Sequence, residues 1–243
     1  MDLKHLRPYQ LHELVAGGHP LLVPAGCIET HGPHMAIGHD TLIVEEICER
    51  IVARTTCAIA PSFDYGPTGY ALGGPEDGTI DPDYDAFGGY VKSILRNFIE
   101  MGFRKIYVII MHQGMGAPLA LAFSKGASEL SFEMVLDKGH KRGWWGDRKA
   151  LDKVGWSNPI DVQPMILPEA SPPAGGDHAG YNETSFLIAT RPELVEQDRL
   201  DENAPWYCRE NEEKNSWTAN AEHGQAMVDA VVDTWVAKID KER

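Results

Sequence analysis

Short apolar runs alternate with longer segments of helical spacing along this chain, and that alternation constrains the fold more than any other feature. The clearest run is 105–111, in which a lysine is followed only by apolar residues. Residues 21–26 and 57–60 are similar runs. Short apolar runs with turn-forming residues at their ends are typical of buried strands. We therefore predict a strand in each of these three segments.

Amphipathic spacing predicts helices between and after these strands, at 41–53, 84–101, 118–130 and 221–239. The apolar residues 186–189 fit either a helix or a strand. Residues 61–82, rich in glycine, proline and aspartate, are predicted to form a functional loop. Strands that alternate with helices favour an α/β fold, here a three-layer α/β/α sandwich with a mainly parallel central sheet.

Composition narrows the classes of function. A chain of 243 residues can bury roughly 70–75% of its unfolded surface, so any metal site is expected to be functional rather than structural. A net charge of −14 opposes binding to nucleic acid or to anionic membranes. The four cysteines lack C-x-x-C spacing, the first residues lack an apolar leader, and no apolar run reaches about 18 residues. We expect a cytoplasmic protein without membrane or nucleic-acid partners.

Five side chains able to bind metal are crowded into one glycine- and proline-containing segment: Glu29, His31, His34, His39 and Asp40. This segment directly follows the first predicted strand. In parallel sheets, ligands collect outside the carboxyl ends of the strands. Imidazole together with carboxylate suits Zn, Mn or Fe. A polar surface loop that happens to contain histidines is the alternative at this point.

Three further polar residues lie near the ends of apolar segments. His112 ends the strand predicted at 105–111, where it could be a ligand or a hydrogen-bonded bystander, and the glycines after it permit close approach of the backbone. Glu183 could bind metal or cap a helix. His178 could be a base or a satisfied polar group. Spacing alone leaves these alternatives open.

The first cluster closely resembles the signature of the creatininase (creatinine amidohydrolase) family, Glu-x-His-Gly-Pro-His with an aspartate six residues later. The matching residues are Glu29, His31, Gly32, Pro33, His34 and Asp40. Other resemblances follow in the same order at 78–80, 102–105, 178–180, 183–185 and 191–195. Together they extend from about residue 21 to residue 200.

This resemblance implies a single creatininase-like domain over residues 1–243, a site for two divalent metal ions (Zn, Mn or Fe), and a homo-oligomer, commonly a hexamer. Glu29, His31, Asp40 and His112 fall on metal-ligand positions, with Asp40 as the bridge. Glu183 falls on the remaining carboxylate ligand and counts among the catalytic residues. His178 falls on a catalytic histidine, and His34 would orient a ligand.

The chain also departs from the family pattern. Many members have Asn-Gly-His-Gly-Gly-Asn around the strand-end histidine, and here Ile110 and Met115 replace the two asparagines. Creatininase itself has a metal-binding glutamate just after this histidine, and this chain has none. That argues against creatinine as the substrate and assigns the remaining ligand role to Glu183. The usual serine near the start of the motif is Cys27, which we expect to pack or orient the loop.

The predicted function is that of a metal-dependent amidohydrolase. A water activated by two metal ions would cleave a C–N bond of a small amide, cyclic amide or formamide. Two alternatives stay open: a metal-binding protein without hydrolase activity, and a non-haem iron enzyme. Trp144, Trp145 and Trp156 could close over a planar substrate or pack in the core or at an interface. Residues 61–82 could line the entrance.

Overall fold

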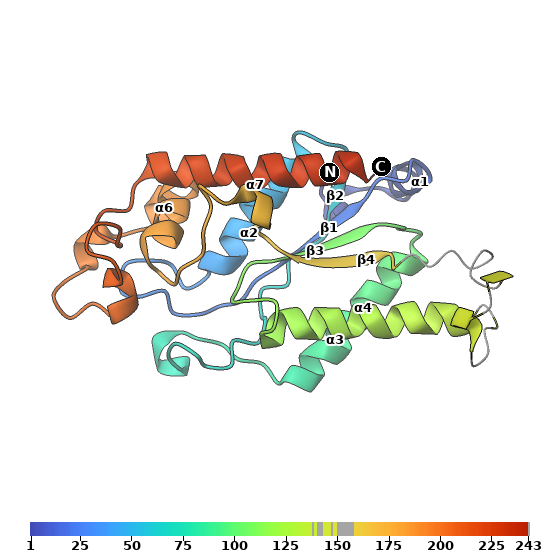
Figure 1. Ribbon diagram of the computed structural model, residues 1–243, viewed down its shortest axis with the longest axis horizontal. Helices are drawn as coiled ribbons and strands as arrows, with labels where there is room; N and C mark the ends of the chain where they lie inside the picture. Colours follow the sequence, from blue (N-terminus) through green and yellow to red (C-terminus); the bar gives the residue numbers. More distant parts are fainter. Residues whose placement is uncertain (138, 140–142, 147, 150–157, 243) are drawn as a thin grey trace.

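Four parallel strands form the centre of the computed structural model, which describes residues 1–137, 139, 143–146, 148–149 and 158–242 (Figure 1). The strands are β1 (Leu21–Ala25), β2 (Ala58–Ile59), β3 (Ile106–Ile110) and β4 (Ile160–Pro164), in the spatial order β2-β1-β3-β4. All the strand pairs in this sheet are parallel, with Leu21 opposite Ile106 and Ile106 opposite Ile160. Both β1 and β3 are completely buried.

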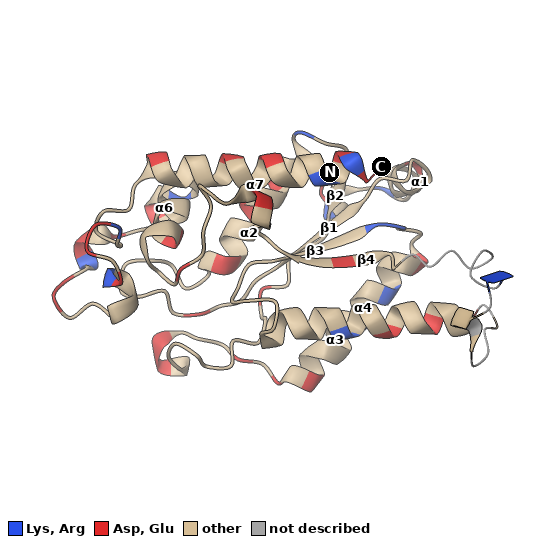
Figure 2. Cartoon of the chain, in the orientation of Figure 1, with Lys and Arg blue, Asp and Glu red and all other residues tan. Residues whose placement is uncertain are grey.

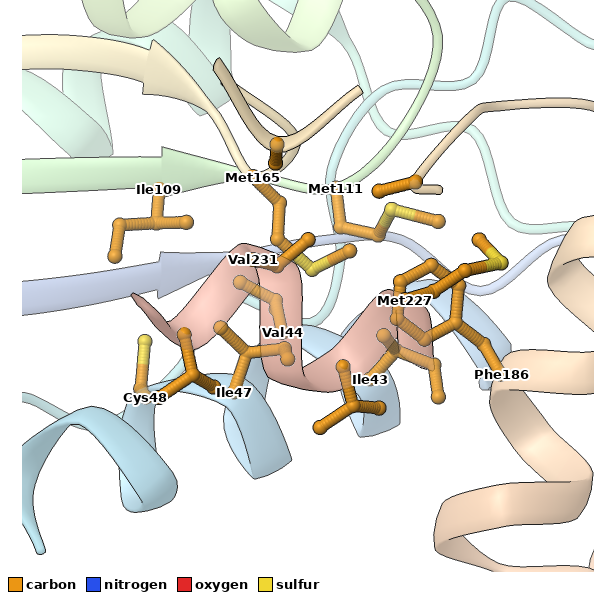
Figure 3. Packing of buried hydrophobic residues seen from close by; sticks show 14 of the residues in the cluster. Ile43, Val44, Ile47, Cys48, Ile109, Met111, Met165, Phe186, Met227 and Val231 are labelled. Atoms are coloured by element: carbon orange, nitrogen blue, oxygen red, sulfur yellow. The ribbon is translucent and has the colours of Figure 1, made fainter. Parts of the chain in front are cut away.

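Helices cover both faces of this sheet. Leu22, Tyr107 and Ile109 pack into one apolar cluster with α2 (His39–Val52), α6 (Tyr181–Thr190) and α7 (Ala221–Lys241). Figure 3 shows this cluster from close by, with Ile43, Val44 and Ile47 of α2 lying near Val231 of α7. Strands covered on both sides read as continuous apolar runs, which accounts for the sequence pattern.

The alternate residues of the strands face the other layer. Leu21, Val23 and Val108 belong to a second apolar cluster, with side chains from α1 (Pro8–Ala16), α3 (Tyr84–Glu100) and α4 (Pro118–Asp137). The predicted three-layer α/β/α sandwich with a parallel sheet is therefore confirmed. Single 3-10 turns complete the described elements: Leu3–His5, Pro75–Asp77, Trp144–Gly146, Pro168–Ala170, Pro192–Leu194, Gln197–Arg199 and Trp206–Arg209.

Residues 186–189, which fitted either a helix or a strand, are helical, inside α6. Helix α1 and strand β4 lie in segments for which no element was predicted. Strand β4 was not predicted, because its polar residues Asp161 and Gln163 interrupt the apolar pattern. That alternation fits its position at the edge of the sheet, where its residues are only partly buried.

The two helices α3 and α4 are joined by ion pairs on their outer surface. Lys92 Nζ lies 2.6 Å from Glu129 Oε2, and Arg96 Nη2 lies 2.6 Å from Glu133 Oε2. Figure 2 shows charged residues of both signs spread over the helices and loops. Among the described residues, no helix is both long enough and apolar enough to cross a membrane.

The contact between α6 and α7 depends on a glycine. A Cβ atom built on Gly224 would lie 1.9 Å from the carbonyl oxygen of Ser185, so the backbone of one helix would have to move. We expect Gly224→Ala to lower the free energy of unfolding, by about 1–3 kcal/mol or more, as is typical of overpacking. Urea unfolding followed by circular dichroism measures this difference.

Gly89 of α3 provides a matched control. A Cβ atom there would meet no atom within 4 Å. Gly89→Ala is therefore expected to raise the free energy of unfolding, by about 0.5–1 kcal/mol, because alanine loses less conformational freedom on folding. Equal stability of Gly224→Ala and wild type would contradict the close contact between α6 and α7.

Candidate metal centre

Five predicted ligands converge at the carboxyl ends of β1 and β3. Glu29 and His31 lie in the loop after β1, Asp40 lies in the first turn of α2, and His112 follows β3 directly. Glu183 comes from the first turn of α6. All five are between 1% and 7% exposed. The structure therefore brings together the five residues that the sequence analysis selected.

Glycine allows the loop after β1 to lie against the start of α2. A Cβ atom on Gly26 would lie 2.6 Å from the backbone nitrogen of Thr41. Gly32 has a φ of +71°, a left-handed conformation that favours glycine and turns the chain between His31 and His34. These two positions let the loop fold back on itself, with His31 beside Asp40.

The carboxylate of Asp40 lies between two sets of donor atoms. Its Oδ2 atom is 2.9 Å from His112 Nδ1, and it accepts a hydrogen bond from the Cys27 thiol at 3.1 Å. His112 Nδ1 is also 3.6 Å from Glu29 Oε2. On the other side, Asp40 Oδ1 is 3.3 Å from His31 Nε2. Each oxygen of Asp40 therefore faces a different set.

The second set includes Glu183 and a histidine. Glu183 Oε2 lies 3.6 Å from His31 Nε2 and 4.0 Å from His39 Nε2. The backbone N–H of Ala179 donates to the same oxygen at 2.8 Å and fixes its position. Besides a smaller group of Glu29, His31 and His178, the described residues thus form two candidate sets for metal ions: Cys27, Glu29, Asp40 and His112, and His31, His39, Asp40 and Glu183. Asp40 is common to both of these sets.

His178 lies beside these sets with a defined orientation. Its Nε2–H donates to the carbonyl of Thr30 at 3.0 Å, so Nδ1 is the free acceptor of the neutral ring. Nδ1 lies 4.0 Å from Glu29 Oε2, and the ring packs edge-on against Tyr207. Burial, together with the nearby His31, lowers the pKa of His178 to about 4. The ring is therefore a neutral base that faces the cluster.

His34 points away from the cluster. Its Nε2 is 2.9 Å from the hydroxyl of Thr184, the residue after Glu183. This contact joins the loop after β1 to α6. The predicted role for His34, to orient a ligand, stays a prediction, and the contact to α6 is compatible with it.

The electrostatic balance of the cluster is unusual for a buried site. Burial raises the pKa of Glu183 well above its usual range and also raises that of Glu29. Burial opposes the charge of Asp40 too, but attraction to His31 and hydrogen bonds from His112 and His31 hold its pKa well below the usual range. Three carboxylates are therefore confined together, an arrangement that a divalent cation would stabilise.

Several buried polar atoms at the cluster have no hydrogen-bond partner within the described part of the chain. They are Glu29 Oε1, His34 Nδ1, His112 Nε2 and both ring nitrogens of His39. Buried polar groups are ordinarily paired. Imidazole nitrogens and carboxylate oxygens are the donors that suit Zn, Mn or Fe. The donor set, the shared Asp40 and the unpaired atoms of Glu29, His39 and His112 together fit two divalent ions.

The loop at 61–82 is held against the segments that carry the cluster by hydrogen bonds between side chains and backbone. The hydroxyl of Thr79 accepts from the backbone N–H of Thr30, and Gln113 Nε2 donates to the carbonyl of Thr68. Asp81 holds the loop by accepting from the N–H groups of Thr68 and Gly69. The loop therefore lies beside the segments that carry the cluster, and its role in lining an entrance stays a prediction.

The tryptophans lie elsewhere or outside the described residues. Trp144 and Trp145 belong to a turn beyond the C-terminal end of α4, whereas the cluster lies at the other end of that helix (Figure 1). Trp145 is 63% exposed. Trp156 falls outside the described residues. Closure of Trp145 over the site of its own chain is therefore not supported.

The family resemblance left two members of the cluster outside the predicted ligand set. Cys27 was assigned to the packing of the loop, and its thiol reaches both Asp40 and His112, at 3.1 and 3.3 Å. His39 was one of the five possible ligands but had no counterpart in the family signature. Its position directly before Asp40 was the sequence signal that could have placed it at the site.

Comparison with known proteins shows which family the chain resembles along most of its length. The family model for creatininase, creatinine amidohydrolase, matches residues 4–239. Creatinine amidohydrolase of Pseudomonas putida is 26% identical over 196 residues, 79% of this chain and 72% of that protein. A 3-dehydro-scyllo-inosose hydrolase of Thermotoga maritima is 26% identical over 76% of this chain and 54% of its own length. A mycofactocin precursor peptide peptidase of Mycobacterium ulcerans is 26% identical over 74% and 62%.

Solved structures show the likeness of the fold. A creatininase in a manganese form superimposes with a TM-score of 0.76 at 21% identity, covering 99% of this chain and 98% of that one. A creatininase variant of Zn–Zn type gives a TM-score of 0.77 at 21% identity, covering 99% and 97%. The family match spans nearly the whole sequence, and Glu29, His31, Asp40, His112 and Glu183 lie at one buried site. The chain belongs to the creatininase family.

Proposed function

We propose that this protein is a metal-dependent hydrolase that cleaves a C–N bond of a small amide, cyclic amide or formamide. The observation that carries the proposal is the position of Asp40, whose two oxygens face two separate sets of donor atoms. Glu29, Asp40 and His112 would hold one ion, and His31, Asp40 and Glu183 would hold the other. Residues 1–243 would act as one catalytic domain.

The chemistry would divide between the ions and the chain. Two divalent ions supply a Lewis acid and a bound water whose pKa is lowered towards ~7. The neutral Nδ1 of His178 would take up a proton and deliver it to the departing nitrogen. The Thr30 carbonyl keeps that ring in the required tautomer. The Glu29 carboxylate lies 4.0 Å from Nδ1 of His178 and 3.6 Å from Nδ1 of His112. It would therefore bind its ion together with His112, close to the proton-carrying ring.

The surroundings of the site favour a small substrate that is partly apolar. A cavity of about 410 Å³ borders His112 and Glu183 and is lined partly by Met111 and Met165. Small-molecule sites are commonly concave and mostly apolar, with a few polar groups. No glutamate follows His112, in contrast to creatininase, so we infer a substrate other than creatinine. The substrates to be tested therefore include small amides and short peptides.

The proposal includes a homo-oligomer, up to a hexamer. Apolar side chains lie exposed on α3 and α4, among them Tyr90, Leu121, Phe132 and Leu136. Such a surface is typical of a contact between subunits. The neighbouring subunit could then border the entrance beside residues 61–82.

Removal of the metal tests the proposed function. We expect a chelator to abolish turnover and added Mn, Zn or Fe to restore it, because the water is activated only when metal is bound. The assay is a panel of amides, formamides, lactams and short peptides, with ammonia or amine release as the signal. Activity that survives complete chelation would contradict the proposal.

The same preparation separates the two alternative functions. Full metal content with no turnover on the panel would favour a metal-binding protein without hydrolase activity. Oxygen consumption together with a visible iron chromophore would favour a non-haem iron enzyme.

A further inference from the structure

His39 is buried at the cluster but has no part in the mechanism proposed above. It is the first residue of α2 and precedes Asp40 directly. Its side chain is completely buried, its Nε2 atom lies 4.0 Å from Glu183 Oε2, and its ring centroid lies 4.8 Å from that of His31. It therefore lies against the set formed by His31, Asp40 and Glu183.

Both ring nitrogens of His39 lack a hydrogen-bond partner in the part of the chain that the structure describes. A neutral imidazole has one donor and one acceptor, and burying both unpaired is costly. The neighbouring histidines differ in this respect. His31 Nδ1 is paired with the carbonyl of Glu29, His178 Nε2 with that of Thr30, and His34 Nε2 with the hydroxyl of Thr184.

The distances around His39 are those of ligands grouped about one ion. His31 Nε2 lies 3.3 Å from Asp40 Oδ1 and 3.6 Å from Glu183 Oε2, and the chosen donor atoms of all four residues lie within 4.8 Å of one another. Ligands on opposite sides of a zinc ion are separated by about 4.2 Å, twice the usual bond length of about 2.1 Å. The 4.0 Å between His39 and Glu183 falls inside that limit.

We propose that His39 is an additional imidazole ligand to the ion held by His31, Asp40 and Glu183. This inference rests on the proposed two-metal site and adds a residue that the family signature does not contain. One ion would then have two imidazole ligands, whereas the ion at Glu29, Asp40 and His112 would have one. Imidazole favours Zn over Mn more strongly than carboxylate does. The two positions would therefore differ in their metal preference.

Nuclear magnetic resonance of the protein labelled with ¹⁵N-histidine and loaded with ¹¹³Cd tests this directly. A scalar coupling between ¹¹³Cd and a ring ¹⁵N arises only through a coordinate bond. We expect three coupled histidines, His31, His39 and His112, with His34 uncoupled as the buried internal control. In His39→Gln one coupled signal should disappear. Coupling at His31 and His112 with none at His39 would overturn the proposal.

A second measurement uses metal affinity. His39→Gln is expected to weaken Zn binding at one of the two positions by at least about tenfold and to weaken Mn binding less. A loss of about tenfold in metal affinity already follows the removal of residues that only hydrogen-bond to a ligand. His12→Gln on the exposed surface of α1 is the matched control and should change neither affinity. Equal losses for Zn and Mn would contradict the assignment of an imidazole ligand.

The outcomes also separate this inference from the proposed function. If no histidine couples to ¹¹³Cd, the two-metal site itself is wrong, and so is the function built on it. If His31 and His112 couple and His39 does not, only the inference about His39 fails. The spectrum of the unmodified protein decides between these results, so the test does not depend on the folding of the variant.

Discussion

Replacing Asp40 by asparagine is expected to remove metal from both positions and to lower kcat/KM by more than about 100-fold. Changing a residue that only hydrogen-bonds to a metal ligand typically costs about 10–100-fold, and the loss of a ligand itself should cost more. The reason is the shared carboxylate: Oδ1 faces His31, and Oδ2 faces His112. An amide nitrogen cannot bind a cation, so at least one set loses a donor, and both lose the negative charge. Metal content after gel filtration and kcat/KM on the best substrate of the panel measure the effect.

Asp85→Asn is the matched control for this variant. Asp85 is also an acidic residue in the first turn of a helix, α3, but it is exposed. It should leave the metal content and the activity unchanged. Wild-type metal content in Asp40→Asn would mean that Asp40 does not bridge the two ions.

The second large effect is expected for His178→Ala. Loss of a general acid–base residue lowers the rate by typically about 10²–10⁴-fold, and we expect a fall in kcat of that size. The metal content should stay near that of wild type, because Nδ1 lies 4.0 Å from Glu29 and Nε2 is occupied by the carbonyl of Thr30. Single-turnover kinetics and metal analysis on the same sample measure both quantities.

His178→Gln separates a role in proton transfer from a role in structure. Its amide N–H can still donate to the carbonyl of Thr30, but the amide cannot carry a proton between substrate and water. We therefore expect the same loss of kcat as in His178→Ala, together with a wild-type melting temperature. Loss of one metal ion from either variant would instead assign His178 to the group it forms with Glu29 and His31.

Much of the fold was predictable because the strands are buried on both faces. Continuous apolar runs such as those of β1 and β3 are typical of strands covered by helices on both sides, and the helix α3 shows clear amphipathic spacing. Strand β4 escaped prediction because two of its five residues, Asp161 and Gln163, are polar and it lies at an edge of the sheet. An edge strand of this kind resembles a loop in sequence, and only the pairing with β3 defines it.

The site was predictable in its residues but not in its geometry. Glu29, His31 and Asp40 lie close in sequence, so a metal site was expected from the sequence alone. Glu183 is far along the chain, and its approach depends on the packing of α6 against α2. The loop after β1 carries both His31 and His34, but only His31 turns towards Asp40. That choice follows from backbone conformation, such as the positive φ of Gly32, and not from spacing.

The convergence of α2, α6 and the ends of β1 and β3 on one cluster would link metal occupancy to the stability of the whole chain. The proposed ligands come from segments that only the folded state holds together, so an ion bound there would stabilise that state by mass action. At a free metal concentration 100 times the dissociation constant, binding at one site adds about 2.7 kcal/mol to the free energy of unfolding. The melting temperature in different cations thus ranks the metals for this protein before any substrate is known.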